Sequence, residues 1–144
     1  MKKLIFICRG NKLRSPIAEA IFNKDPVKGW KAFSYGTEVE KEGWQNMKLS
    51  QFGGDLQIAL EEMGKLDMDI SNKKCNQILP EYVEKANKVI VMAETKFVPD
   101  WLEKKNYERW EIHNPENISE FYDQDLISLL SEKVNELKKS LEKT

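Results

Sequence analysis

The chain has 144 residues, of which 40% are hydrophobic and 33% charged, and this predicts a single globular domain over residues 1–144. Lysine and arginine number 23 and aspartate and glutamate 24, so the net charge of −1 gives no argument for a nucleic-acid or membrane partner. With two cysteines, Cys8 and Cys75, and one histidine, His113, we expect no disulfide scaffold, no structural metal site and a cytoplasmic location.

Apolar runs of strand length alternate with helical patterns along the chain. Residues 3–8 predict a buried strand, 15–23 a helix, 32–37 a second strand and 55–64 a helix that ends at a glycine. Residues 88–93 predict a third strand, followed by a short or broken helix around Pro99, and residues 108–115 predict a fourth strand that stops at a proline. From Ser119 onward, one stripe of apolar residues predicts a single long amphipathic helix.

Nearly all-apolar strands that alternate with helices are typical of a parallel sheet covered on both faces. We therefore predict an α/β fold of three αβα layers with a central four-stranded parallel sheet. The irregular residues 38–54 are expected to form a surface loop near the carboxyl edge of the sheet, where ligands bind in open α/β folds.

The first strand ends in Cys8, and the residues RGNKLRS that follow must turn into the first helix. Backbone N–H groups of such a turn form an anion site together with the helix N-terminus. Gly10 is expected to relieve an unusual dihedral, and Asn11 tolerates a left-handed one. Arg14 supplies a planar fork for two oxygens of a phosphoryl group, and Ser15 could donate a hydrogen bond to the Cys8 sulfur. These surroundings favour the thiolate form of Cys8.

The predicted fold thus includes a phosphate-binding loop after the first strand, with the binding residues Arg9, Gly10, Asn11, Lys12, Leu13, Arg14 and Ser15. The competing interpretation is a buried cysteine that merely ends a strand, which is common for this residue type. A cysteine followed at this spacing by Arg-Ser, at a strand-to-helix junction, favours a nucleophile. The segment is not a Walker A loop, because it lacks the G-x-x-x-x-G-K-[ST] pattern.

The segment CRGNKLRSPIAEAIF resembles the signature C-x-G-N-x-C-R-S-P-x-A-E-A of the low-molecular-weight protein tyrosine phosphatases, whose scaffold some arsenate reductases share. The resemblance spans nearly the whole chain. SYGT at 34–37 is similar to the family's S-A-G-T turn, and DMDISNKKCNQI at 67–78 is similar to its G-I-D-x-S-x-H-x-A-R-Q-L segment. WEIHNP at 110–115 resembles the strand that carries the family's Asp-Pro general acid.

The resemblance implies a cysteine-dependent phosphomonoesterase that forms a phosphocysteine intermediate and needs no metal or other cofactor. Cys8 would attack phosphorus, while Arg14 and the backbone amides of residues 9–14 would hold the phosphoryl oxygens. Asn11 would shape the loop, and Ser15 would stabilise the departing thiolate. The expected partners are a phosphotyrosine protein or a small aryl phosphate, with phosphate or another oxyanion in the loop.

Asn114 is the main departure from the family, because the resemblance places the catalytic aspartic acid at this position. An asparagine amide can neither protonate the leaving group nor activate water, and general acid–base catalysis contributes ~10²–10⁴-fold. Activity is therefore expected to be impaired, unless Glu116, Asp123 or Asp125 substitutes. His113 is expected to be a surface or supporting histidine. An asparagine here is also a way to build a substrate trap, so an engineered variant is a further alternative.

Smaller departures from the family concern the residues around the loop. Leu13 replaces a second loop cysteine, so the resemblance implies no protective disulfide with Cys8. Lys73 stands where the family usually has a histidine that supports the loop asparagine. Glu116 and Asn117 stand where aromatic residues often flank the substrate ring.

Five further residues have open interpretations. Trp44 or Phe52 could line the cleft in place of the missing aromatic residues, or simply pack within the long loop. Arg9 and Lys12 either favour anionic substrates or are solvated charges. Cys75 is expected to be partly buried on a short element, with a redox role as the alternative.

Three functions remain in competition at this point. The favoured one is a cysteine phosphatase that is slow or uses a relocated acid. The second is a phosphatase-like module that binds phosphotyrosine or phosphate without efficient turnover. The third is a thiol-coupled arsenate reductase, which is disfavoured because the residues VMAETKFVPD at 91–100 contain no cysteine to relay a disulfide.

Overall fold

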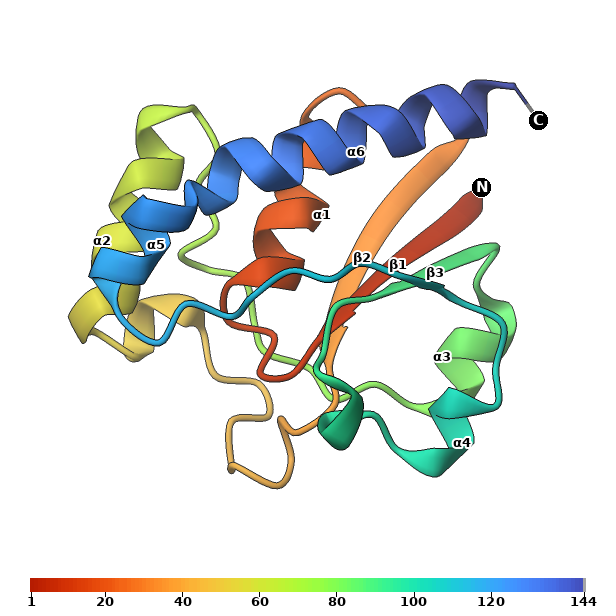
Figure 1. Cartoon of the computed structure of the whole chain (residues 1–144), viewed down its shortest axis with the longest axis horizontal. Coiled ribbons are helices and arrows are strands. Elements are labelled where there is room, and N and C mark those ends of the chain that lie inside the picture. The colour runs from red at the N-terminus through yellow and green to blue at the C-terminus, as the bar shows by residue number, and fades with distance from the viewer. Residues whose placement is uncertain (144) are drawn as a thin grey trace.

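The computed structural model describes residues 1–143, with a four-stranded parallel sheet at its centre (Figure 1). The strands, in the spatial order β2-β1-β3-β4, are β1 (Lys2–Cys8), β2 (Trp30–Gly36), β3 (Lys88–Val91) and β4 (Glu108–Arg109). Every neighbouring pair is parallel; Cys8, for example, pairs with Gly36. The predicted α/β fold with a parallel four-stranded sheet is confirmed.

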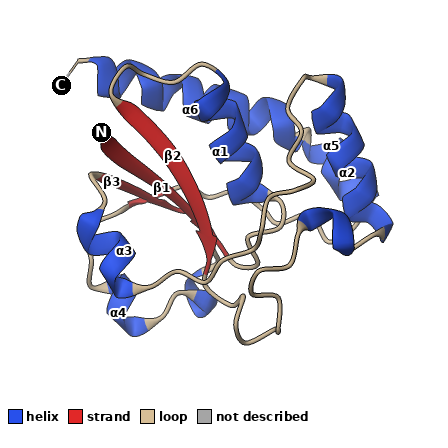
Figure 2. Cartoon of the chain, turned by 180° about the vertical axis from the view of Figure 1, so that it is seen from behind, coloured by secondary structure: helices blue, strands red, loops and turns tan. Residues whose placement is uncertain are grey.

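Helices cover both faces of this sheet, as Figures 1 and 2 show from opposite sides. On one face lie α1 (Arg14–Lys24) and α6 (Leu126–Glu142), with α2 (Gly54–Lys65) and α5 (Ile118–Gln124) beyond the end of the sheet. On the other face lie α3 (Pro80–Lys85) and α4 (Asp100–Glu103). The three-layer αβα arrangement is therefore confirmed.

The central strand β1 is buried on both faces because its side chains alternate between two cores. Leu4, Phe6 and Cys8 belong to the core under α1 and α6, and Ile5 and Ile7 belong to the core against α3 and α4. This explains the unbroken apolar run in the sequence. It also places Cys8 at the carboxyl end of β1, on the side where α1 begins.

The predicted fourth strand is much shorter than expected, since only residues 108 and 109 pair with β3. The strand β3 itself ends at Val91, so Trp110 is the last residue whose amide bonds to it, at 3.0 Å from the Val91 oxygen. Beyond that point no strand within residues 1–143 pairs with the segment, although Trp110 and Ile112 remain buried. The extended segment then carries Asn114 toward the carboxyl end of β1.

The predicted C-terminal helix is two helices, α5 and α6, separated by Asp125. Asp125 has a left-handed backbone with φ of +50°, which aspartate tolerates better than most residues do. The break lets α5 pack against α2 while α6 packs along α1. Sequence periodicity did not reveal the break, because the apolar stripe continues on both sides of it.

Short elements complete the fold. A 3₁₀ turn, η1 (Leu49–Gln51), lies within residues 38–54, and a second, η2 (Thr95–Phe97), precedes α4 near Pro99. Residues 38–54 are largely irregular and mostly exposed, as predicted, but Val39 and Leu49 are fully buried and anchor the segment to the core. The helix α3 was not predicted, since its six residues are too short to show a helical period.

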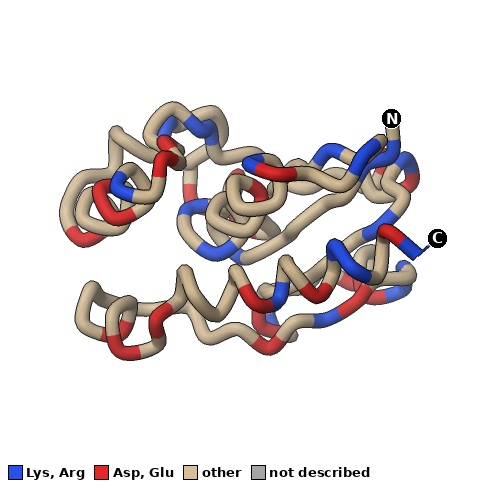
Figure 3. Tube along the Cα trace, turned by 90° about the horizontal axis from the view of Figure 1, so that it is seen from above, with Lys and Arg blue, Asp and Glu red and all other residues tan. Residues whose placement is uncertain are grey.

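Charged residues of both signs are interspersed along the chain (Figure 3). Within residues 1–143, no helix combines the length and apolar character that crossing a bilayer would require.

Candidate active site

The residues between β1 and α1 form the floor of a cleft of about 300 Å³. Of the predicted site residues, the cleft is lined by Cys8, Arg9, Gly10, Lys12, Leu13, Arg14 and Asn114. Asn11 and Ser15 are fully buried behind this floor. The structure thus brings every predicted site residue to one place, with Asn114 arriving from a segment far along the chain.

Cys8 lies at the bottom of the cleft and contacts Ser15. Its Sγ is 3.0 Å from Ser15 Oγ, and the same oxygen accepts a hydrogen bond from Asn11 Nδ2 at 2.9 Å. Cys8 is almost fully buried, yet it lines the cleft. The serine hydroxyl is therefore placed to donate a hydrogen bond to the sulfur.

Asn11 holds the loop in shape from behind. Its backbone is left-handed, with φ of +57°, as predicted for this residue. Its Nδ2 donates to Ser15 Oγ and, at 3.0 Å, to Ser34 Oγ, while its Oδ1 accepts from the Asn76 amide at 2.9 Å. These three contacts tie the loop to α1, to β2 and to the segment that precedes α3.

Gly10 has a different role from the one predicted. Its φ is not positive, so the prediction of a relieved dihedral was wrong. Instead, a Cβ at Gly10 would lie 3.1 Å from Cζ3 of Trp44, so the missing side chain makes room for the indole ring. The true close approach of backbones occurs at Gly36, where a Cβ would lie 2.7 Å from the Arg9 oxygen.

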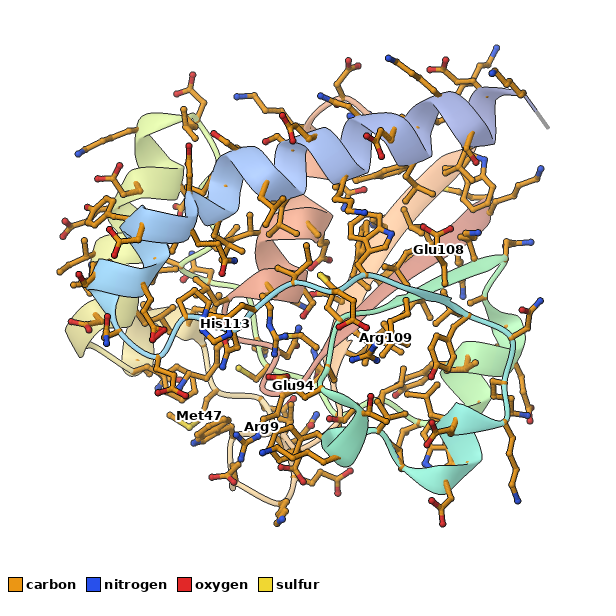
Figure 4. The ribbon with its side chains drawn as sticks, viewed as in Figure 1. Arg9, Met47, Glu94, Glu108, Arg109 and His113 are labelled. Atoms are coloured by element: carbon orange, nitrogen blue, oxygen red, sulfur yellow. The ribbon has the colours of Figure 1, made fainter. Side chains whose placement is uncertain are left out.

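Arg14 is 1% exposed and fixed by three hydrogen bonds. Its Nη1 donates to the backbone oxygens of Met92 at 2.7 Å and Ile112 at 2.9 Å, and its Nη2 donates to Glu94 Oε1 at 3.0 Å. Figure 4 shows Glu94 near Arg9 at the carboxyl end of the sheet. Nε of Arg14 is buried and has no hydrogen-bond partner within residues 1–143. That atom is a donor without an acceptor.

The backbone of the loop offers further donors. Within residues 1–143, no protein group accepts a hydrogen bond from the backbone amides of four loop residues, Gly10, Asn11, Lys12 and Leu13. Backbone amides of a turn that leads into a helix, together with an arginine, are suited to bind an anion. Among residues 1–143, no cluster of three or more histidine, cysteine, aspartate or glutamate side chains could hold a metal ion.

A partly buried charged pair lies behind the loop and supports it. Glu19 Oε1 accepts from Ser34 Oγ at 2.6 Å and lies 3.6 Å from Lys73 Nζ. Burial raises the pKa of Glu19, while Lys73 and the Ser34 hydroxyl act in the opposite direction. Lys73 Nζ also donates to the Ser34 backbone oxygen at 3.3 Å, so its links to Asn11 run through Glu19 and Ser34.

Partial burial acts to raise the pKa of Glu94, but the charge and hydrogen bond of Arg14, a backbone hydrogen bond and the charge of Arg9 together outweigh it, so the pKa lies below its ordinary value. The carboxylate therefore stays charged beside Arg14 at neutral pH. Sequence reasoning missed Glu94, because nothing local marks a partner 80 residues away from Arg14.

One wall of the cleft is built on Trp44, which packs edge-on against Phe52 with ring centroids 5.6 Å apart. Lys12 Nζ lies over both rings, 4.2 Å from the centroid of Trp44 and 4.5 Å from that of Phe52. Of the two aromatic residues considered for the cleft, Trp44 lines it and Phe52 supports Trp44 from behind. Lys12 is therefore a cation held on an aromatic surface.

Arg9 lies at the rim and is not a freely solvated charge. Its Nε donates to Glu38 Oε1 at 3.1 Å, its Nη2 is 3.9 Å from Glu42, and its guanidinium stacks 3.8 Å from the centre of Phe97. These contacts join the phosphate loop to the loop at 38–54, which contains Glu38 and Glu42, and to η2, which contains Phe97.

The opposite wall contains Asn114, Pro115, Glu116, Asn117 and Ile118. Of the three carboxylates considered as replacements for the acid, only Glu116 lines the cleft; Asp123 and Asp125 do not. Two carboxylates that sequence reasoning did not consider, Glu42 and Asp55, also line it.

His113 lies outside the cleft, as predicted for a surface histidine. Its Nε2 is 3.1 Å from Glu120 Oε2 (His113 is labelled in Figure 4). Cys75 differs from its prediction, because it is fully buried in a loop under the phosphate loop, with Sγ 3.5 Å from the Asn11 oxygen. Burial, assisted by the negative charge of Cys8, raises the pKa of Cys75 to about 11.

Residues 3–144 match the model of the low molecular weight phosphotyrosine protein phosphatase family. The chain belongs to this family. Membership supports a phosphatase-type function that uses a cysteine, and it agrees with the resemblance seen in the sequence. No curated protein matches the chain in sequence.

Solved structures share the fold of this phosphatase family member at low sequence identity. Wzb from Vibrio vulnificus, in complex with benzylphosphonate, is 19% identical with a TM-score of 0.76, covering 96% of this chain and 98% of that one. An arsenate reductase in the phosphate binding state is 22% identical with a TM-score of 0.71, covering 97% and 98%. YwlE arginine phosphatase from Geobacillus stearothermophilus is 18% identical with a TM-score of 0.71, covering 99% and 96%.

Proposed function

We propose that this protein is a cysteine-dependent phosphomonoesterase of the tyrosine phosphatase type. The observation that carries the proposal is the position of Cys8 Sγ, 3.0 Å from Ser15 Oγ on the floor of the cleft. Around it are loop amides without protein acceptors and the unpaired Nε of Arg14. This combination supplies a nucleophile and the donors for a phosphoryl group in one place.

In the first step the Cys8 thiolate attacks phosphorus. The S–P bond forms, the ester P–O bond breaks, and its electron pair leaves with the substrate oxygen. Arg14 and the loop amides hold the other phosphoryl oxygens as charge develops in the transition state. In the second step water attacks phosphorus, the S–P bond breaks and phosphate is released. Ser15 stabilises the returning thiolate by a hydrogen bond.

The proposed substrates are phosphotyrosine proteins or small aryl phosphates, with phosphate or a related oxyanion bound in the loop. The cleft offers apolar surface beside the loop, including Leu13, Trp44 and Leu56, against which an aryl group can pack. The complex of the Vibrio vulnificus protein with benzylphosphonate supports an aryl phosphate as ligand class.

Asn114 favours one alternative, a phosphatase-like module that binds phosphate or phosphotyrosine with little turnover. Its amide lines the cleft but cannot donate the proton that a poor leaving group needs. We propose impaired rather than absent activity, because activated esters need little protonation.

An arsenate reductase is the weaker alternative, supported by the structural similarity to solved arsenate reductases. Disulfide relay requires accessible thiols, and Cys75, the second cysteine of the chain, is fully buried with its pKa raised to about 11.

The test is hydrolysis of p-nitrophenyl phosphate by the chain as given, by Asn114→Asp and by Cys8→Ser. The proposal requires turnover by the chain as given above the Cys8→Ser background. Turnover in Asn114→Asp alone would instead support the binding module, with an intact loop that lacks its acid. Activity in neither protein would refute the phosphatase function.

A further inference from the structure

Phosphoryl transfer to Cys8 leaves a negative charge on the substrate oxygen, and a poor leaving group needs a proton there. This inference rests on the proposed function. Asn114 occupies the cleft, but an amide has no proton to give at neutral pH. The proton donor must therefore be sought among the other ionisable side chains that line the cleft.

The cations of the cleft are poorly suited to this role. Arg9 and Arg14 do not lose a proton in proteins. Lys12 is held against the aromatic wall, with its Nζ 4.2 Å from the centroid of Trp44 and 4.5 Å from that of Phe52. Its ammonium group is thus engaged at the side of the cleft.

Three carboxyl groups line the cleft, and two of them have partners. Asp55 Oδ2 accepts a hydrogen bond from the Ile118 amide at 2.9 Å, which fastens the start of α2 to the wall. Glu42 lies 3.9 Å from Nη2 of Arg9. The side chain of Glu116 has neither a hydrogen bond nor an ion pair within residues 1–143. It is the uncommitted carboxyl group of the cleft.

The backbone around Glu116 is anchored, although its side chain is free. Its amide points to Glu120 Oε2 at 3.4 Å, and Asn117 caps α5 by accepting from the Glu120 amide at 2.9 Å. Pro115 restricts the turn between Asn114 and Glu116. The wall therefore presents the Glu116 carboxyl group two residues from the position of the missing acid.

We propose that Glu116 is the proton donor of this active site in place of Asn114. As the P–O bond breaks, its electron pair goes to the leaving oxygen, which takes the proton of the Glu116 carboxyl group. In the second step the carboxylate takes a proton from the attacking water while the S–P bond breaks. Glu116 is then protonated again, and the Cys8 thiolate is free.

The test compares Glu116→Gln with the chain as given on a series of aryl phosphates, from p-nitrophenyl phosphate to phenyl phosphate. Loss of a general acid slows mainly the esters with poor leaving groups. Hydrolysis of phenyl phosphate should therefore fall about 100-fold, which is within the usual contribution of a general acid. Hydrolysis of p-nitrophenyl phosphate should fall only a few-fold. The double variant Asn114→Asp, Glu116→Gln should recover phenyl phosphate hydrolysis, because a carboxyl group returns to the wall.

Glu132→Gln is the matched control, since Glu132 is an exposed carboxylate on α6 outside the cleft and should leave the whole series unchanged. An equal effect of Glu116→Gln on every ester, or none, would overturn the proposal while the phosphatase function stands. A selective loss in Asp55→Asn instead would assign the role to Asp55 and overturn it too. If p-nitrophenyl phosphate hydrolysis does not exceed the Cys8→Ser background, the proposed function fails and this inference fails with it.

Discussion

Lys73 Nζ lies 3.6 Å from Glu19 Oε1 in a partly buried pair behind the phosphate loop. Glu19 also accepts from Ser34 Oγ, which in turn accepts from Asn11 Nδ2 at 3.0 Å. A continuous line of contacts therefore runs from a charged pair to the asparagine that shapes the loop. The charge of Lys73 compensates a carboxylate that would otherwise be costly to bury.

The pH dependence of stability should report on Glu19. Burial raises the pKa of Glu19, so the folded state favours its protonated form more than the unfolded state does. Its contribution to the free energy of unfolding is fully present below the unfolded value, roughly 4.3, and is lost as pH rises through the higher folded value. Relative to Glu19→Gln, the chain as given should therefore lose stability over the pH range that begins at the unfolded pKa of Glu19 and ends at its raised folded pKa.

Urea unfolding of both proteins across that range measures the effect, with their difference removing all other titrating groups. The difference is between the free energies of unfolding of the two proteins. If it stays constant with pH, or if the chain as given becomes relatively more stable at higher pH, the pKa of Glu19 is not raised by folding.

Gly36→Ala should damage the loop. A Cβ at this position would lie 2.7 Å from both the Arg9 oxygen and Val39 Cγ2, so backbone must shift. We expect a loss of about 1–3 kcal/mol in the free energy of unfolding, as for overpacked cores, together with reduced hydrolysis. Gly64→Ala in α2 is the control, because a Cβ there would meet no atom of residues 1–143 within 4 Å other than its chain neighbours and its own helix backbone, and the helix should gain about 0.4–1 kcal/mol. Equal stability of the two variants would disprove the close approach.

The loop after β1 could be predicted from sequence because its parts are local. Cys8, Asn11 and Ser15 lie in or beside the short loop between β1 and α1. The residue types in this loop favour the left-handed backbone of Asn11 and an anion site. The same holds for β1, whose apolar run reflects burial on both faces.

Other features could not be predicted because distant partners decide them. The length of β4 depends on where β3 ends, and Glu94 reaches Arg14 across 80 residues. Cys75 is buried because the phosphate loop folds over it, with Sγ 3.5 Å from the Asn11 oxygen. In each case the local sequence pattern is compatible with more than one structure, and tertiary packing decides which of them forms.

Arg14→Lys should disable the site although it keeps the charge. A lysine cannot donate at once to the oxygens of Met92 and Ile112, to Glu94 and to a phosphoryl group. Loss of one transition-state donor costs about 10²–10³-fold in kcat, and we expect at least this for p-nitrophenyl phosphate. Binding of vanadate, followed by calorimetry, should weaken in parallel. A variant with more than a tenth of the starting kcat would argue against Arg14 as a phosphoryl ligand.

The two cysteines should differ sharply in reactivity toward iodoacetamide. Burial, with the charge of Cys8, raises the pKa of Cys75 to about 11, so this thiol stays protonated at neutral pH and is also inaccessible. Mass spectrometry of the native protein should find one modified cysteine, Cys8, and two after unfolding in urea. Native Cys8→Ser should remain unmodified, and inorganic phosphate should slow the labelling of Cys8 by occupying the loop. Labelling of Cys75 in the folded protein would show that the phosphate loop opens, contrary to the fixed arrangement of Asn11 and Ser15 described above.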